Sequence, residues 1–157
     1  MKFRNFSDLG WKVSEIGLGC WQIGWCWGDI SEKDSREILK EALNNGVNFF
    51  DTSDMYGDGR SERFIGELIK STSEKIYVTT KLGRRTRGTN YEKGFKEKHL
   101  EEFVDRSLIN LGIESIDLVQ LHCPPVEICM KKETHYLMDN LVKKGKIRYY
   151  RRNEVTG

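Results

Sequence analysis

The sequence predicts an α/β fold in which about five parallel strands alternate with helices. Short apolar runs that are rich in β-branched or aromatic residues recur along the 157 residues, and amphipathic stretches with helical spacing separate them. Consecutive apolar positions are typical of a strand that is buried on both faces of a parallel sheet. The expected strands span residues 15–18, 47–50, 76–80, 116–121 and 147–150.

Helical patterns fill the segments between these strands. Ser31 can cap the first helix at its start, and Gly46 can end it in a left-handed turn. Because a helix between two strands makes a right-handed crossover, we expect the strands to be parallel. The first two expected helices begin after Ser31 and after Ser61. The third and longest runs from about Glu97 to Leu111, and Gly112 can end it. The fourth runs from about Glu133 to Lys143.

The charge balance argues against nucleic acid or an anionic membrane as the main partner. The chain has 26 Lys and Arg against 24 Asp and Glu, which gives a net charge of +2. Residues 143–152 are locally basic, but most of this stretch belongs to an expected helix end and strand. No apolar run approaches the roughly 20 residues of a membrane-spanning helix, and the start shows no apolar signal segment. We therefore expect a cytoplasmic protein without a membrane partner.

The cysteines give no sign of a disulfide or zinc framework. Cys20, Cys26, Cys123 and Cys129 show no C-x-x-C spacing, which favours reduced thiols. Taken together with His122, they fit no compact set of metal ligands. We expect no metal site.

Ionisable residues stand where three of the expected strands end. Asp51 follows the second strand, Lys81 the third and His122 the fourth. Tyr56 lies five residues beyond Asp51. The carboxyl ends of parallel strands meet at one edge of the sheet, where the active sites of barrels lie. We therefore expect these four side chains to form a site.

Each of the four residues also has an ordinary structural explanation, because a single charged residue at a strand end is usually a solvated loop residue. Asp51 could cap a turn, and Tyr56 could pack on the surface. Lys81 could open a solvated basic loop, and His122 could be a core imidazole that bonds to the backbone. An acid, a phenol, an amine and an imidazole at corresponding strand ends favour a site over chance.

A longer pattern surrounds these residues. It comprises Gly46–Gly57, Ser61-Glu62 with Gly66, Thr79–Lys81, Leu108–Leu111 with Asp117–His122, and Gly145–Tyr149. This pattern resembles that of the aldo-keto reductases, a family of NAD(P)H-dependent enzymes with a TIM-barrel fold. The family has an Asp, a Tyr five residues later, and a Lys and a His at later strand ends, and all four positions match. Gly17–Cys20 also resembles the family's opening, so the resemblance covers about Phe3 to Tyr150.

The resemblance implies reduction of a small-molecule carbonyl compound, an aldehyde or a ketone. Hydride transfer leaves negative charge on the carbonyl oxygen, so a proton donor has to lie beside that oxygen. We expect Tyr56 to be this donor. A phenol is ordinarily a weak acid with a pKa of about 10, and a nearby cation makes it a better donor. Lys81 would supply the cation, and Asp51 would pair with Lys81. His122 would bind the carbonyl oxygen and orient the substrate.

The resemblance also implies a nicotinamide cofactor, NADP(H), with NAD(H) left open. It places Asp51 near the nicotinamide ribose and Gly19 beside the cofactor. Trp21 and Trp25 follow the first expected strand, and we expect them to wall a pocket for an apolar or aromatic carbonyl compound. The alternative is that they only cover the mouth of the barrel.

The length fits an incomplete (β/α)8 barrel. A TIM barrel needs eight strands and typically about 250 residues, whereas five strands are expected here. The family pattern stops after Tyr150, so we interpret residues 1–150 as the N-terminal part of an aldo-keto reductase barrel and residues 151–157 as a divergent tail. A frameshift, a premature stop or a truncated gene product would explain this tail.

An incomplete barrel has physical consequences. Two sheet edges are left unpaired, so we expect either poor folding or self-association through these edges. In the family, groups after the later strands hold most of the dinucleotide, so we expect weak cofactor binding and weak or no activity. A non-catalytic barrel remnant or a protein-binding subunit is the alternative function. A nucleic-acid binder is a third and less favoured interpretation.

Overall fold

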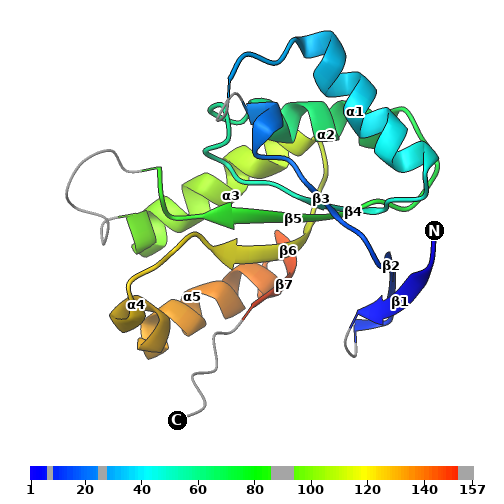
Figure 1. Ribbon diagram of the computed structural model, residues 1–157. Helices are drawn as coiled ribbons and strands as arrows, with labels where there is room; N and C mark the ends of the chain where they lie inside the picture. Colours follow the sequence, from blue (N-terminus) through cyan, green and yellow to red (C-terminus); the bar gives the residue numbers. More distant parts are fainter. Residues whose placement is uncertain (7–8, 25–27, 86–93, 152–157) are drawn as a thin grey trace.

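Five parallel strands lie side by side in the order in which they occur in the chain (Figure 1). The structure of the protein, a computed structural model, describes residues 1–6, 9–24, 28–85 and 94–151. The sheet order is β3-β4-β5-β6-β7, and all four strand pairs are parallel. The strands are β3 (Leu18–Gly19), β4 (Phe49–Asp51), β5 (Tyr77–Leu82), β6 (Ile116–Leu121) and β7 (Ile147–Tyr150). The predicted parallel α/β sheet is confirmed.

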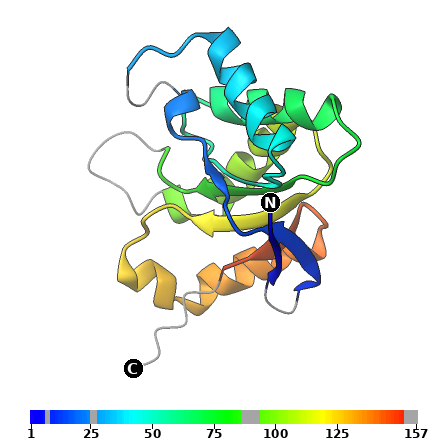
Figure 2. The same cartoon turned by 45° about the vertical axis from the view of Figure 1, so that its right-hand side comes forward.

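Helices connect these strands and pack in sequence against one another, α1 on α2, α2 on α3 and α3 on α5. They follow the outside of the curving sheet from α1 at the top of Figure 1 to α5 at the bottom, and Figure 2 shows the same arrangement from a second direction. The helices are α1 (Glu32–Asn44), α2 (Arg60–Lys70), α3 (Glu97–Leu111), α4 (Val126–Met130) and α5 (Lys132–Lys143), with a short 3-10 turn at Gln22–Gly24.

The predicted helix ends are confirmed where capping chemistry marks them. The Ser31 hydroxyl accepts a hydrogen bond from the main-chain N–H of Asp34 at 3.0 Å, which satisfies a free donor at the start of α1. Gly112 ends α3 with a φ of 64°, in the left-handed region that a side chain rarely adopts. Asn45 caps α1, and Gly46 follows it with a φ of 83°.

The main correction to the predicted elements concerns the N-terminus. Strands β1 (Phe3–Phe6) and β2 (Trp11–Ser14) form an antiparallel hairpin that the sequence analysis did not predict. The strand expected at 15–18 pairs with β4 only from Leu18 onward. Ring packing explains the hairpin: Trp11 stacks on Tyr77 at 5.0 Å between ring centroids and meets Tyr149 edge-on at 5.2 Å. The short helix α4 was also not predicted.

The core lies between the sheet and the helices. From the strands it receives Phe50, Val78, Leu82 and Val119, each at most 1% exposed, and these residues pack against apolar side chains of the helices. Side chains alternate between the two faces of a strand, so the positions between these residues point away from the helices. That opposite face carries Asp51, Thr79, Lys81 and Gln120, which lie next to one another in the strand register.

Candidate active site

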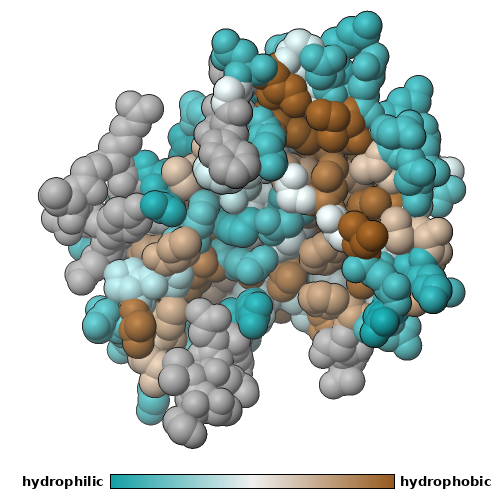
Figure 3. Space-filling model, in the orientation of Figure 1, coloured by the Kyte–Doolittle hydropathy of each residue, from teal (hydrophilic) through white to brown (hydrophobic). Residues whose placement is uncertain are grey.

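Asp51, Lys81 and His122 lie at one edge of the sheet, as the sequence predicts. Asp51 is the last residue of β4 and Lys81 is the last but one of β5. His122 directly follows β6, and its main-chain N–H donates to the Leu82 carbonyl at 2.8 Å, which extends the ladder past the strand. Tyr56 lies in the turn that leads from β4 to α2. Figure 3 shows hydrophilic side chains near the middle of this view, over the carboxyl ends of β5 and β6.

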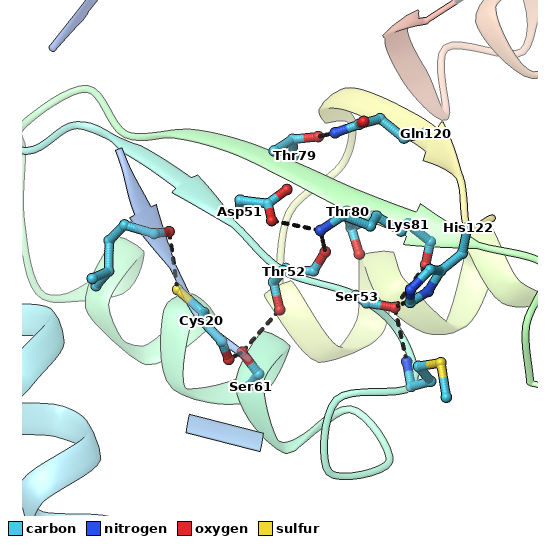
Figure 4. Close-up of polar contacts among 12 residues, drawn as sticks. Cys20, Asp51, Thr52, Ser53, Ser61, Thr79, Thr80, Lys81, Gln120 and His122 are labelled. Carbon is cyan, nitrogen blue, oxygen red and sulfur yellow. Dashed lines mark hydrogen bonds and ion pairs between the residues drawn. The ribbon is translucent and has the colours of Figure 1, made fainter. Parts of the chain in front are cut away.

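Lys81 connects the acid and the phenol. Its ammonium Nζ lies 2.5 Å from Oδ2 of Asp51 and donates to the Thr52 carbonyl at 3.0 Å (Figure 4). The same Nζ lies 5.3 Å from the centre of the Tyr56 ring. The Lys81 side chain is only 18% exposed, so little water competes for the ammonium. A cation in this position can stabilise negative charge that develops on the phenol.

His122 is buried beside Tyr56. The two rings meet edge to face, with centroids 6.0 Å apart. Nδ1 of His122 lies 3.1 Å from the Ser53 hydroxyl oxygen, which leaves Nε2 as the nitrogen available to a ligand. Burial first, then the charges of Lys81 and Arg84, lower the pKa of His122 to about 4. The imidazole is therefore neutral at pH 7.

Sequence reasoning missed two residues next to this group, Ser53 and Asp54. Thr52, Ser53 and Asp54 follow Asp51, and all three are fully buried. The Asp54 carboxyl has its pKa raised to about 7, because burial and the nearby Glu62 carboxylate both disfavour its charge. The signal for these residues is the run of polar side chains directly after a buried apolar strand, of which the sequence analysis used only the first. The same run brings a hydroxyl and a second carboxyl to the site.

Of the other residues that we expected to touch the cofactor and the substrate, the structure describes Gly19 and Trp21. Gly19 pairs with Asp51 in the strand register, and the space where a side chain would project from it is open. Trp21 lies just beyond β3 and is 41% exposed. Trp25 lies outside the described residues.

The described part of the chain shows neither a disulfide nor a cluster of metal ligands. Cys20, Cys123 and Cys129 form no disulfide bond there, whereas Cys26 falls outside the described ranges. Burial and the nearby Asp51 raise the pKa of Cys20 to about 12, so this thiol stays protonated. Within residues 1–6, 9–24, 28–85 and 94–151, no three His, Cys, Asp or Glu side chains are grouped as a metal site would require. Among these same residues no helix has the length and apolar character to cross a membrane.

The fold and the residues near its strand ends define a class of protein, a parallel α/β fold with a carboxylate, an ammonium, a phenol and an imidazole near the carboxyl ends of its strands. Comparison with known proteins identifies the class more closely. The chain belongs to the Aldo/keto reductase family, whose sequence model matches residues 15–151.

Individual relatives agree with this assignment and show how much of the family fold the chain covers. Aldo-keto reductase YhdN of Bacillus subtilis (strain 168) is 34% identical over 151 residues, which make up 94% of this chain and 45% of that protein. A probable voltage-gated potassium channel subunit beta of Arabidopsis thaliana is 29% identical and is matched over 98% of this chain and 47% of its own length. The solved structure of aldo-keto reductase AKR11C1 from Bacillus halodurans, in its holo form, superposes with a TM-score of 0.79 at 32% identity.

That superposition covers 96% of this chain and 49% of the solved chain. The chain thus spans about half the length of the relatives that it matches, and its fold is part of a TIM barrel. The predicted family and the predicted incomplete (β/α)8 barrel are both confirmed.

Proposed function

We propose that this chain carries the proton-transfer residues of an NADP(H)-dependent reductase that acts on an aldehyde or a ketone, with Tyr56 as the proton donor. The observation that carries the proposal is the position of the Lys81 ammonium, paired with Asp51 at 2.5 Å and 5.3 Å from the centre of the Tyr56 ring. An ordinary surface lysine is mostly exposed to solvent. Lys81 is only 18% exposed and is paired with an acid at a strand end.

Each side chain has a task in this reaction. Tyr56 donates its hydroxyl proton to the carbonyl oxygen as negative charge builds there. Lys81 stabilises the phenolate that is left, and Asp51 holds Lys81 in place and compensates its charge. His122 is neutral at pH 7, so its Nε2 can hydrogen-bond the carbonyl oxygen without placing a full charge beside it.

The residues present fit one end of a nicotinamide dinucleotide. The open space beside Gly19 and the partly exposed carboxylate of Asp51, 36% accessible, would accept the ribose that carries the nicotinamide. The bound cofactor supplies the hydride for carbonyl reduction. The resemblance implies that most groups for the pyrophosphate and a 2′-phosphate follow the later strands of the family barrel, so we expect weak cofactor binding. The preference for NADP(H) over NAD(H) and the cytoplasmic location stay predictions.

The test is the dependence of the reduction rate on Tyr56. Purified chain is incubated with NADPH and a simple aldehyde, and the rate is compared with that of Tyr56→Phe. Removal of a general acid typically costs about 100-fold or more, so we expect Tyr56→Phe to abolish most of the rate. Tyr136→Phe is the matched control, because Tyr136 is 62% exposed on α5 and should leave the rate unchanged. A rate that is the same in all three proteins would contradict the catalytic role.

A second function is favoured by one comparison. The Arabidopsis relative is named as a channel subunit, which suggests that a barrel of this family can serve as a binding partner. If no rate depends on Tyr56, the non-catalytic remnant or protein-binding subunit becomes the better proposal.

A further inference from the structure

Ser53 and Asp54 take no part in the proposed reaction, yet both are fully buried in the loop after β4, directly behind His122. Ser53 reaches His122 through its hydroxyl, which lies 3.1 Å from Nδ1 (Figure 4). The Oδ1 oxygen of Asp54 lies 3.3 Å from the same hydroxyl. The hydroxyl therefore stands between a buried carboxyl group and the imidazole.

The Ser53 hydroxyl has more acceptors than it can serve. It carries one proton, and it lies within hydrogen-bonding distance of Nδ1 of His122, of Oδ1 of Asp54 and of the Lys81 carbonyl, the last at 3.1 Å. The Lys81 carbonyl also accepts the main-chain N–H of Asp54 at 3.4 Å, and its second lone pair can still accept from Ser53. Of the three acceptors, only the imidazole nitrogen and the carboxyl group can change their state of protonation.

The choice of acceptor is linked to the position of the proton on the imidazole. A neutral imidazole has one N–H and one bare nitrogen. When Ser53 donates to Nδ1, that nitrogen is bare and the proton is on Nε2. When Ser53 donates to Asp54 instead, Nδ1 has to be the donor to the hydroxyl oxygen, and Nε2 is bare. An ionised carboxylate attracts the hydroxyl proton more strongly than a protonated carboxyl group does.

The surroundings of Asp54 allow both charge states near neutral pH. In the part of the chain that the structure describes, its Oδ2 is buried and has no hydrogen-bond partner. Three charged groups face the carboxyl: Glu62 from α2, Arg85 from the segment after β5 and Arg106 from α3. Burial and Glu62 raise the pKa of Asp54 to about 7, and the two arginines act in the opposite direction.

The charged groups that face His122 keep its ring neutral over the same range. Lys81 from β5 and Arg84 from the segment after β5 both add to the effect of burial and lower the pKa of His122 to about 4. The Tyr56 phenol meets the ring edge-on. Between about pH 5.5 and about pH 8.5 the imidazole therefore stays neutral, so a change in its protonation there can only be a change of tautomer.

We propose that Asp54, acting through the Ser53 hydroxyl, sets which ring nitrogen of His122 carries the proton. With Asp54 protonated, Ser53 donates to Nδ1 and the proton is on Nε2. With Asp54 ionised, its proton has gone to water, the Ser53 hydroxyl turns to the carboxylate, Nδ1 takes up a proton from water and Nε2 releases one. Ser53 and Asp54 are positioning residues, since they act through His122.

The consequence for catalysis rests on the proposed function. A protonated Nε2 donates to a carbonyl oxygen, as reduction requires, whereas a bare Nε2 accepts from the hydroxyl of an alcohol. The pair Ser53 and Asp54 would thus favour carbonyl reduction below about pH 7 and alcohol oxidation above it. The tautomer itself does not depend on any reaction and can be measured without cofactor or substrate.

The experiment is imidazole ¹⁵N NMR on the purified chain between about pH 5.5 and about pH 8.5, because the two neutral tautomers give distinct ¹⁵N shifts at each nitrogen. His99 and His135 are the other two histidines and serve as internal references. For His122 we expect mostly the Nε2–H form at the low end and mostly the Nδ1–H form at the high end, with a midpoint near the Asp54 pKa of about 7. A tautomer that stays constant over this range in the wild-type chain overturns the proposal.

Three variants assign the effect. Asp54→Asn cannot ionise and Ser53→Ala cannot relay, so in both we expect one tautomer of His122 at every pH. Ser107→Ala removes another fully buried hydroxyl, from α3, and should keep the wild-type midpoint. If the His122 tautomer still changes near pH 7 in Asp54→Asn or in Ser53→Ala, the proposal is overturned. Because these spectra need no turnover, a missing Tyr56-dependent rate with an intact tautomer change would reject only the proposed function.

Discussion

At the scale of single residues, Asp54 and His122 titrate in ways that oppose each other. The folded chain keeps Asp54 protonated up to about pH 7, whereas the unfolded chain releases this proton near its ordinary pKa of 3.8. The stability that Asp54 contributes is therefore fully present below pH 3.8 and is lost as the pH rises to about 7. His122 takes up a proton below about pH 6.5 in the unfolded chain but only below about pH 4 in the folded chain. The free energy of unfolding therefore decreases as the pH falls from about 6.5 to about 4.

Asp54→Asn should separate these two effects. The variant cannot ionise, so it avoids the cost of a buried carboxylate at neutral pH. We expect its free energy of unfolding, relative to the wild-type chain, to rise between pH 5 and pH 7.5 by on the order of 1–3 kcal/mol. Urea unfolding at the two pH values measures this difference.

Asp58→Asn is the matched control for that measurement. The Arg85 hydrogen bond, with the Arg106 charge, holds the pKa of Asp58 below its usual range, so Asp58 is ionised in both the folded and the unfolded chain above pH 5. The difference between this variant and the wild-type chain should be the same at both pH values. An Asp54→Asn variant that behaves like Asp58→Asn would show that Asp54 is ionised in the folded chain throughout.

Site residues could be predicted from the sequence only where they stand at the end of an expected strand. Asp51, Lys81 and His122 follow buried apolar runs, so the direction of a parallel sheet was enough to bring them together. Ser53 could not be found in this way, because its contact with Nδ1 of His122 joins residues that are far apart in the chain. Asp54 could not be found in this way either, since only the tertiary structure shows its burial.

At the scale of elements, the contact of α2 with α3 depends on a glycine inside a helix. A side chain built on Gly66 would place its Cβ 2.6 Å from the main-chain carbonyl oxygen of Leu111 and 2.8 Å from that of Asn110. These are main-chain atoms, which cannot turn aside as the end of a flexible side chain can. The close approach of the two helices therefore requires that residue 66 has no side chain.

Gly66→Ala should destabilise the chain although alanine is the better helix former. We expect a loss of about 1–3 kcal/mol, because overpacking outweighs the gain in helix propensity. Thermal unfolding followed by circular dichroism measures it. Gly19→Ala is the control, since nothing lies within 4 Å of its added Cβ. Equal melting temperatures for the two variants would mean that α2 and α3 can move apart at little cost.

Element boundaries were predictable where local signals mark them. The bounds of α3, β6 and β7 agree with the predicted bounds, because an apolar run or a terminal glycine such as Gly112 fixes each end. The hairpin of β1 and β2 was missed because its stability comes from Trp11 packing on Tyr77 and Tyr149, which belong to later strands. The sequence pattern of residues 3–14 does not contain that information.

At the scale of the whole molecule, the sheet has two free sides among the described residues. β3 pairs only with β4, and β7 pairs only with β6. A strand with unpaired N–H and C=O groups is a template for another strand. We propose that copies of the chain associate through these edges.

Sedimentation velocity of the purified chain over a wide concentration range tests this association. We expect a dimer or a larger species that becomes more populated as the concentration rises. A monomer of 18.3 kDa at every concentration would contradict the proposal. The measurement does not depend on Tyr56 or on cofactor, so it is independent of the catalytic test.

The docking of Trp11 against Tyr149 also bears on how the chain folds. The two residues are far apart in the sequence, so their contact closes a long loop. During synthesis on the ribosome the hairpin is made before β7, so its indole has to wait for β7 before it finds this partner. Quenching of the Trp11 fluorescence would then report a late step of folding, in which the hairpin docks on β7.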